Sequence, residues 1–112
     1  MTSIQSKLQK VGEALAAELG EGIVFHYWRA VTSAPMCIWA EDGESSSVRM
    51  DLREREQAIS GTVDLFTKEE YDPRADAVQR ALNASCSNWA INSVQYEEDT
   101  KLIHYEWRFT VI

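Results

Sequence analysis

The strongest structural constraint in the sequence is a strict alternation of apolar and polar residues from Ile103 to Val111. Successive side chains of a strand point to opposite faces, so this segment has one apolar face and one polar face. Such a strand is typical of an antiparallel sheet that packs one face on a core and exposes the other. The apolar face carries Ile103, Tyr105, Trp107, Phe109 and Val111, and the polar face carries His104, Glu106, Arg108 and Thr110.

Two other segments have the apolar spacing of amphipathic helices. The first covers residues 3–19, and Gly20 and Gly22 end it. The second starts at Asp72-Pro73, where Asp is a favoured cap and Pro a favoured first helical residue. We expect residues 83–88 to be a loop. The two apolar stripes are Ile4, Leu8, Val11, Leu15 and Leu19, and Ala75, Val78, Ala81 and Leu82.

Five segments rich in β-branched and aromatic residues are predicted strands: residues 23–30, 36–40, 57–68, 89–96 and 102–112. Residues 97–101 are polar and join the last two strands in a hairpin. Gly61 indicates a bulge or a close backbone approach. The sequence therefore predicts one α+β domain over residues 1–112, with a mainly antiparallel sheet of about five strands and two helices. The predicted order is helix, three strands, helix, two strands.

Residues 41–56 differ from the rest in composition. They begin with a polar, turn-rich stretch, and Arg49 to Glu56 then carries six charged residues and only two apolar ones. We expect a long exposed loop or a protruding hairpin here, and long loops in small domains are often functional.

The net charge of the 112 residues is −7, which disfavours broad binding to nucleic-acid phosphates. An acidic wall could still let DNA pass without adhering.

The longest apolar run, Met36 to Ala40, is too short to span a membrane, and the charges in residues 1–20 break any signal-peptide pattern. The two cysteines lack C-x-x-C spacing, so we expect reduced thiols in a cytosolic compartment.

No motif in the sequence supports catalysis. Cys37 and Cys86 lack the neighbours that activate a thiolate, and neither His26 nor His104 stands in a triad pattern. Metal-ligand spacings and phosphate-binding glycine loops are also missing from the sequence. We therefore expect no enzyme activity, no catalytic residues, no metal and no cofactor.

Three stretches together resemble the small tail-completion proteins of tailed phages and prophages. They are Pro35 to Gly43, Val63 to Lys68 followed by the Asp-Pro helix start, and the closing hairpin from Tyr96 to Phe109. The resemblance covers residues 23–112. It implies a virion structural protein, a tail terminator or neck component assembled in the host cytoplasm. Its partners would be copies of itself in a ring, often of six subunits, the tail tube and head-completion proteins, with DNA passing through the centre.

The residues also support assembly through heterologous contacts. Two helices can cover only one face of a small sheet, so Val24, Trp28 and Trp39 are expected to stay partly exposed unless another subunit covers them. Charges of alternating sign would set the register of that contact. The predicted subunit-interface residues are Trp28, Trp39, Arg49, Asp51, Arg53, Glu54 and Arg55.

Two rival hypotheses remain open at the level of sequence. The first is an acidic inhibitor or immunity-type protein that binds a basic partner such as a nuclease, which the net charge would suit. The second is a small enzyme of unknown chemistry, which the lack of catalytic motifs in the sequence disfavours. An inhibitor should stay monomeric until it meets its partner, whereas a ring component should self-associate.

Overall fold

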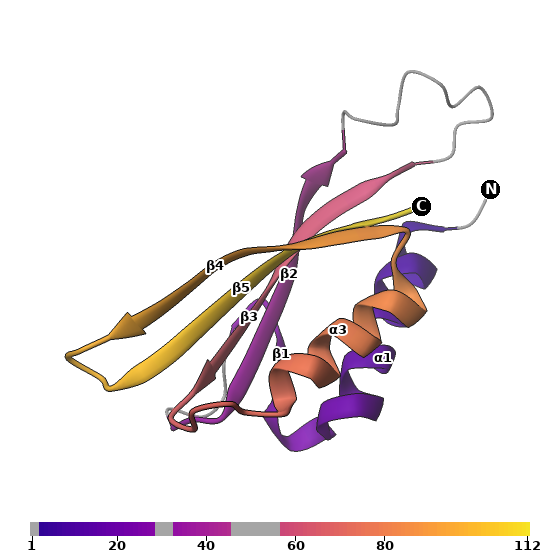
Figure 1. The fold of residues 1–112 in the computed structure, drawn as a ribbon. Helices are drawn as coiled ribbons and strands as arrows, with labels where there is room; N and C mark the ends of the chain where they lie inside the picture. The colour runs from indigo at the N-terminus through magenta and orange to yellow at the C-terminus, as the bar shows by residue number, and fades with distance from the viewer. Residues whose placement is uncertain (1–2, 29–32, 46–56) are drawn as a thin grey trace.

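The computed structural model describes residues 3–28, 33–45 and 57–112. These residues form two helices and a five-stranded sheet, and the predicted α+β class and order of elements are confirmed (Figure 1). The elements in chain order are α1 (Ile4–Leu19), the 3-10 turn η1 (Glu21–Ile23), β1 (Val24–His26), β2 (Met36–Glu44), β3 (Ile59–Thr67), α3 (Arg74–Ser85), β4 (Asn88–Glu97) and β5 (Leu102–Val111).

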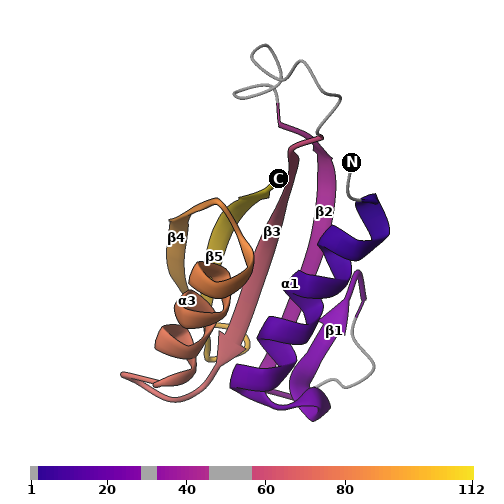
Figure 2. The same ribbon diagram turned by 90° about the vertical axis from the view of Figure 1, so that its right-hand side faces the viewer.

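The strands lie side by side in the order β1-β2-β3-β5-β4. β1 pairs with β2 in parallel, and the other three pairings are antiparallel. Both helices lie on one face of this mixed sheet, with α1 over β1 and β2 and α3 over the β5 side (Figure 2). We call this the covered face and the opposite one the open face.

The core lies between the helices and the covered face. Trp107, Phe109 and Val111 of β5 are buried there, as the alternation predicts. Their polar neighbours lie on the open face, where Arg108 is exposed. The residues that the other elements contribute to the hydrophobic core are Leu8, Val11 and Leu15 of α1, Cys37 and Trp39 of β2, Ile59, Val63 and Leu65 of β3, and Val78, Ala81 and Leu82 of α3.

Several predicted boundaries are wrong. Glu41 to Glu44 continue β2, because β3 supplies antiparallel pairing partners as far as Glu44; for these four residues this excludes the exposed loop and agrees with the hairpin alternative. β1 ends at His26, where Tyr27 takes a positive φ of 77° that no strand can continue. Residues 83–85 belong to α3, and Ser85 Oγ donates to the carbonyl of Ala81 at 2.8 Å. Residues 46–56, the rest of the predicted loop, lie outside the described residues.

Gly61 marks both a bulge and a close backbone approach, as predicted. It pairs with Glu41 where the register of β2 shifts between Glu41 and Gly43. A Cβ atom at Gly61 would lie 2.6 Å from the ring of Phe109 and 2.8 Å from Cα of Glu41, and closer still to the carbonyl oxygen of Ala40. Backbone atoms cannot move aside as a flexible side chain can, so only glycine fits here.

We expect Gly61→Ala to lower the free energy of unfolding by about 2–3 kcal/mol, since overpacking a core usually costs 1–3 kcal/mol. Urea denaturation measures the change. Gly22→Ala is the control: a Cβ at Gly22 meets no atom within 4 Å, so the expected change stays within about 0.5 kcal/mol. Equal effects of the two substitutions would contradict this account of Gly61.

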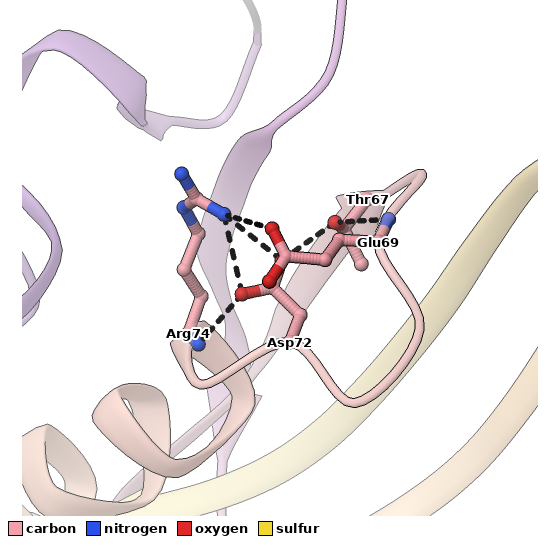
Figure 3. A network of polar contacts seen from close by, with 4 residues as sticks. All are labelled: Thr67, Glu69, Asp72 and Arg74. Carbon is pink, nitrogen blue, oxygen red and sulfur yellow. Dashed lines mark hydrogen bonds and ion pairs between the residues drawn. The ribbon is translucent and has the colours of Figure 1, made fainter.

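The start of α3 is held by a buried carboxylate (Figure 3). Asp72 is 3% exposed, and its Oδ1 accepts the backbone N–H of Arg74 at 2.9 Å. Its Oδ2 accepts the hydroxyl of Thr67 at 2.5 Å and a guanidinium N–H of Arg74 at 3.1 Å. Asp72 thus accepts the first backbone N–H of α3, but the predicted start is one position too early: the N-cap residue is Pro73 and the first helical residue is Arg74.

This network makes the stability of the fold depend on pH. Burial raises the pKa of the Asp72 carboxyl, but the hydrogen bonds from Thr67 and Arg74 and the charge of Arg74 outweigh it and hold that pKa below its usual value. A lowered folded-state pKa stabilises the fold above the unfolded-state pKa of about 3.9, and the gain is lost as the pH falls through the folded value.

We expect Asp72→Asn to lower the free energy of unfolding by about 1–3 kcal/mol at pH 7, because it leaves buried donors without their charged partner. The difference from the wild type should shrink at about pH 3, which lies below the unfolded-state pKa of about 3.9. Urea denaturation at both pH values measures this. Asp99→Asn, in the exposed turn between β4 and β5, is the matched control. A difference that does not change with pH would contradict the proposed linkage.

Candidate functional site

Neither thiol meets the requirements of a catalytic nucleophile. Cys37 is fully buried in β2, and burial, with the nearby Asp64 charge, raises its pKa to about 12. Burial also raises the pKa of the Cys86 thiol. A hydrogen bond with Ser85 lowers that pKa, but by less than burial raises it. Both side chains therefore remain protonated thiols at neutral pH, where the reactive species is the thiolate.

Two histidine–carboxylate pairs join residues that are distant in the sequence. On the covered face, His26 Nε2 lies 2.8 Å from Glu41 Oε1. On the open face, His104 Nε2 lies 2.7 Å from Asp64 Oδ1, and the ring of Phe66 stacks on His104. Sequence reasoning missed both pairs, since their members are 15 and 40 residues apart.

The other charged groups of the open face are also paired. Arg108 contacts Asp42 at 3.2 Å, and Asn92 donates to Glu106 at 2.9 Å. Burial raises the pKa of the Asp64 carboxyl, a shift that His104 partly offsets. In the part of the chain that the structure describes, no three His, Cys, Asp or Glu side chains gather as a metal site. No helix among the same residues is long and apolar enough to cross a membrane.

The β4–β5 hairpin projects beyond both helices (Figure 1). Its covered-face side chains continue the apolar surface of the core outward, because Val94 pairs with Tyr105 and Tyr96 with Ile103. Tyr105 stacks on the buried Trp107 with ring centres 5.7 Å apart. Towards the tip of the hairpin this surface has no helix above it.

Three side chains of β4 are left exposed as a result. Ile91, Val94 and Tyr96 retain 48%, 52% and 59% of their accessible surface. We call these three residues the hairpin patch. Exposed apolar side chains that gather in one place usually mark an interaction site.

β4 is also an edge strand without the usual protection against pairing. Residues 88–96 contain no charged residue and no proline, in a chain whose charged fraction is 26%. Among the described residues, β4 pairs with β5 along one of its edges. The other edge of β4 faces outward. The protective features present on β4 are a bulge between Ile91 and Ser93 and the charged Glu97 at the end of the strand. An edge of this kind favours contact with another chain.

A second exposed patch follows β1 at the opposite edge of the sheet. Tyr27 and Trp28 are 50% and 71% exposed, and we call them the aromatic patch. Tyr27 stacks on His26, which stacks on Trp39, with ring centres 3.8 Å apart in both pairs. The hydroxyl of Tyr27 donates to Glu41, which raises the pKa of that hydroxyl. This column of rings fixes the patch to the core.

Glu41 holds the aromatic patch in place through its hydrogen bonds with Tyr27 and His26. Burial raises the pKa of its carboxyl, but hydrogen bonds with Tyr27 and His26 outweigh that effect and hold the pKa below its usual value. Next to this column, a shallow pocket of about 170 Å³ lies between α1 and the sheet. It is lined by Gln5, Leu8, Gln9, His26 and Trp39.

The structure places the predicted interface residues in three different situations. Trp28 is exposed, as expected. Trp39 is 4% exposed, so the expectation that it stays on the surface is wrong: its ring packs against Gly12 of α1. Residues Arg49, Asp51, Arg53, Glu54 and Arg55 lie outside the described residues, and their role at an interface stays a prediction. The hairpin patch was not predicted.

Comparison with solved structures finds a similar fold in a virion. One match is a chain of the virion of a native gene transfer agent (GTA) particle, with a TM-score of 0.51 and 14% sequence identity. The match covers 97% of this chain and 94% of that chain, so the likeness extends over the whole domain. No family model matches the sequence. No curated protein matches it either.

We expect the hairpin patch to contribute little to folding, because its side chains stay largely in solvent. The double substitution of Val94→Ser and Tyr96→Ser should change the free energy of unfolding by less than about 1 kcal/mol. Trp107→Ala, in the core behind the patch, should cost about 3–5 kcal/mol. Urea denaturation compares the two proteins. A comparable loss from both would show that the patch serves the fold of the single subunit.

Proposed function

We propose that this chain is a non-enzymatic structural protein of a phage-like virion, a tail terminator or tail-completion component. In this role, copies of the chain form a ring at the head–tail interface. The ring ends growth of the tail tube and offers a docking surface for the head. The protein assembles in the host cytoplasm and remains in the particle.

The observation that carries this proposal is a fold shared with a virion component over nearly the full length of both chains. The sequence resemblance to tail-completion proteins supports the same assignment. The exposed surface of the subunit fits a structural role, since five of the eight exposed large hydrophobic side chains among the described residues lie on the projecting hairpin or beside β1. A ring component needs such surfaces to hold its neighbours.

The charge of the protein fits a ring through which DNA passes. A net charge of −7 repels DNA phosphates, so an acidic channel would let DNA through without binding it. The partners proposed for the ring are further copies of this chain, the end of the tail tube and the head-completion proteins.

Deleting the gene for this chain from the strain that encodes it tests the proposal. We expect heads that lack joined tails and tail tubes of uncontrolled length, both visible by electron microscopy. Supplying the wild-type gene in trans should restore joined particles. Particles of normal tail length and number in the deletion strain would overturn the proposal.

A second outcome would point to the inhibitor hypothesis. In that case the deletion would leave particles unchanged, while the purified protein would stay monomeric and bind tightly to one basic protein. A size measurement of the purified protein over a concentration series distinguishes this outcome from self-association.

A further inference from the structure

We infer that the hairpin patch of one copy of this chain binds the aromatic patch of a second copy, an inference that rests on the proposed ring-forming function. The contact joins Ile91, Val94 and Tyr96 on β4 to Tyr27 and Trp28 after β1. It deepens the proposed function by assigning the subunit contact to particular surfaces.

The position of the two patches in the sheet favours a chain of like contacts. β4 and β1 are the two outermost strands of the order β1-β2-β3-β5-β4. One copy can therefore use both patches at once, each with a different neighbour. Contacts between unlike patches are heterologous, and they close into rings when the rotation between neighbours permits.

Charge favours contact at these patches. Copies that each carry a net charge of −7 repel one another over most of their surfaces. Residues 88–96 of β4 carry no charge, and the turn that follows them concentrates acidic residues at the tip of the hairpin. Two copies can therefore approach most closely along β4, where the repulsion is least.

The area involved fits a ring component that assembles on a template. Buried Tyr and Trp side chains cover roughly 150–250 Å² each, so the exposed parts of the two patches together amount to about 600 Å² of apolar surface. Interfaces are about 57% apolar, which corresponds to a contact of about 1,000 Å² in total. This lies at the low end for a specific interface.

A single contact of this size is weak, whereas a ring gives every subunit two of them. Closure turns the last contact into an intramolecular one, which strengthens the whole assembly without any new surface. A second copy therefore accounts for both patches, while a partner of another kind would account for one.

Cross-linking between separate copies tests the contact directly. Tyr96→Cys in one copy and Trp28→Cys in a tagged second copy are mixed and treated with a short bifunctional thiol reagent. Both proteins carry Cys86→Ser, and Cys37 is buried in the core. The matched control is Gln95→Cys, because Gln95 neighbours Tyr96 on the same strand and pairs with His104 on the open face.

We expect the 96–28 pair to give at least about tenfold more cross-linked dimer than the 95–28 pair, because only position 96 lies in the contact. Circular dichroism and urea denaturation check that each variant is folded. Equal yields from the two pairs would overturn the inference. A dominant link between two copies of position 96 would also overturn it, since that product indicates a symmetric contact of the hairpin with itself.

Complementation in the deletion strain separates failure of this contact from failure of the proposed function. The variant with Val94→Ser and Tyr96→Ser should fail to restore joined particles, while Gln95→Ser should restore them. If the first variant restores normal particles in a strain that needs the wild-type gene, the contact is wrong and the proposed function stands. If the deletion strain makes normal particles but the 96–28 link forms, the proposed function is wrong and the contact stands.

Discussion

A helix rises about 1.5 Å per residue and a strand about 3.3 Å. This difference determines how much of the sheet the helices can cover. The 16 residues of α1 and the 12 of α3 reach about 24 Å and 18 Å, whereas a ten-residue strand reaches about 33 Å. The sheet is therefore longer than its helical cover. The core fills where both layers are present, and the rest of the β4–β5 hairpin keeps an apolar face without a second layer.

The single-layer part of the hairpin stays in place because it is continuous with the core. Tyr105 stacks on Trp107, and Trp107 is held by a hydrogen bond from its indole nitrogen to Gln79 of α3 at 3.1 Å. Trp89 makes the corresponding bond to Asn83 at 2.7 Å. The helix thus fixes both strands at their inner ends, so the projecting ends can present exposed side chains in a defined geometry.

The sequence predicts the fold well where a segment has one buried face. The alternation from Ile103 to Val111 assigns β5 and its buried side correctly, because each polar residue excludes one face from the core. Met36 to Ala40 lacks such polar residues, so its pattern cannot say which side chains face inward. Trp39 was therefore expected near the surface, although it lies in the core.

Long-range pairing explains the other differences between expectation and structure. Glu41 to Glu44 look like a loop on composition, yet β3 pairs with them and their charged side chains stay at the surface or bond to neighbours such as His26. The parallel pairing of β1 with β2 leaves no mark in local composition. The hairpin patch was missed for the same reason: whether Val94 and Tyr96 are covered depends on how far α3 reaches, which the residues of β4 do not encode.

The open face of the sheet carries paired charges, whereas the projecting part of the covered face is apolar. This difference limits where a partner can bind. On the open face the charged groups are already satisfied by one another, as in the pairs of Arg108 with Asp42 and His104 with Asp64. A partner docking there would have to break these pairs and pay their desolvation cost. On the covered face, the projecting part of β4 offers largely apolar side chains, and covering them breaks no ion pair. In the proposed assembly through the hairpin, the paired charges of the open face would stay in solvent.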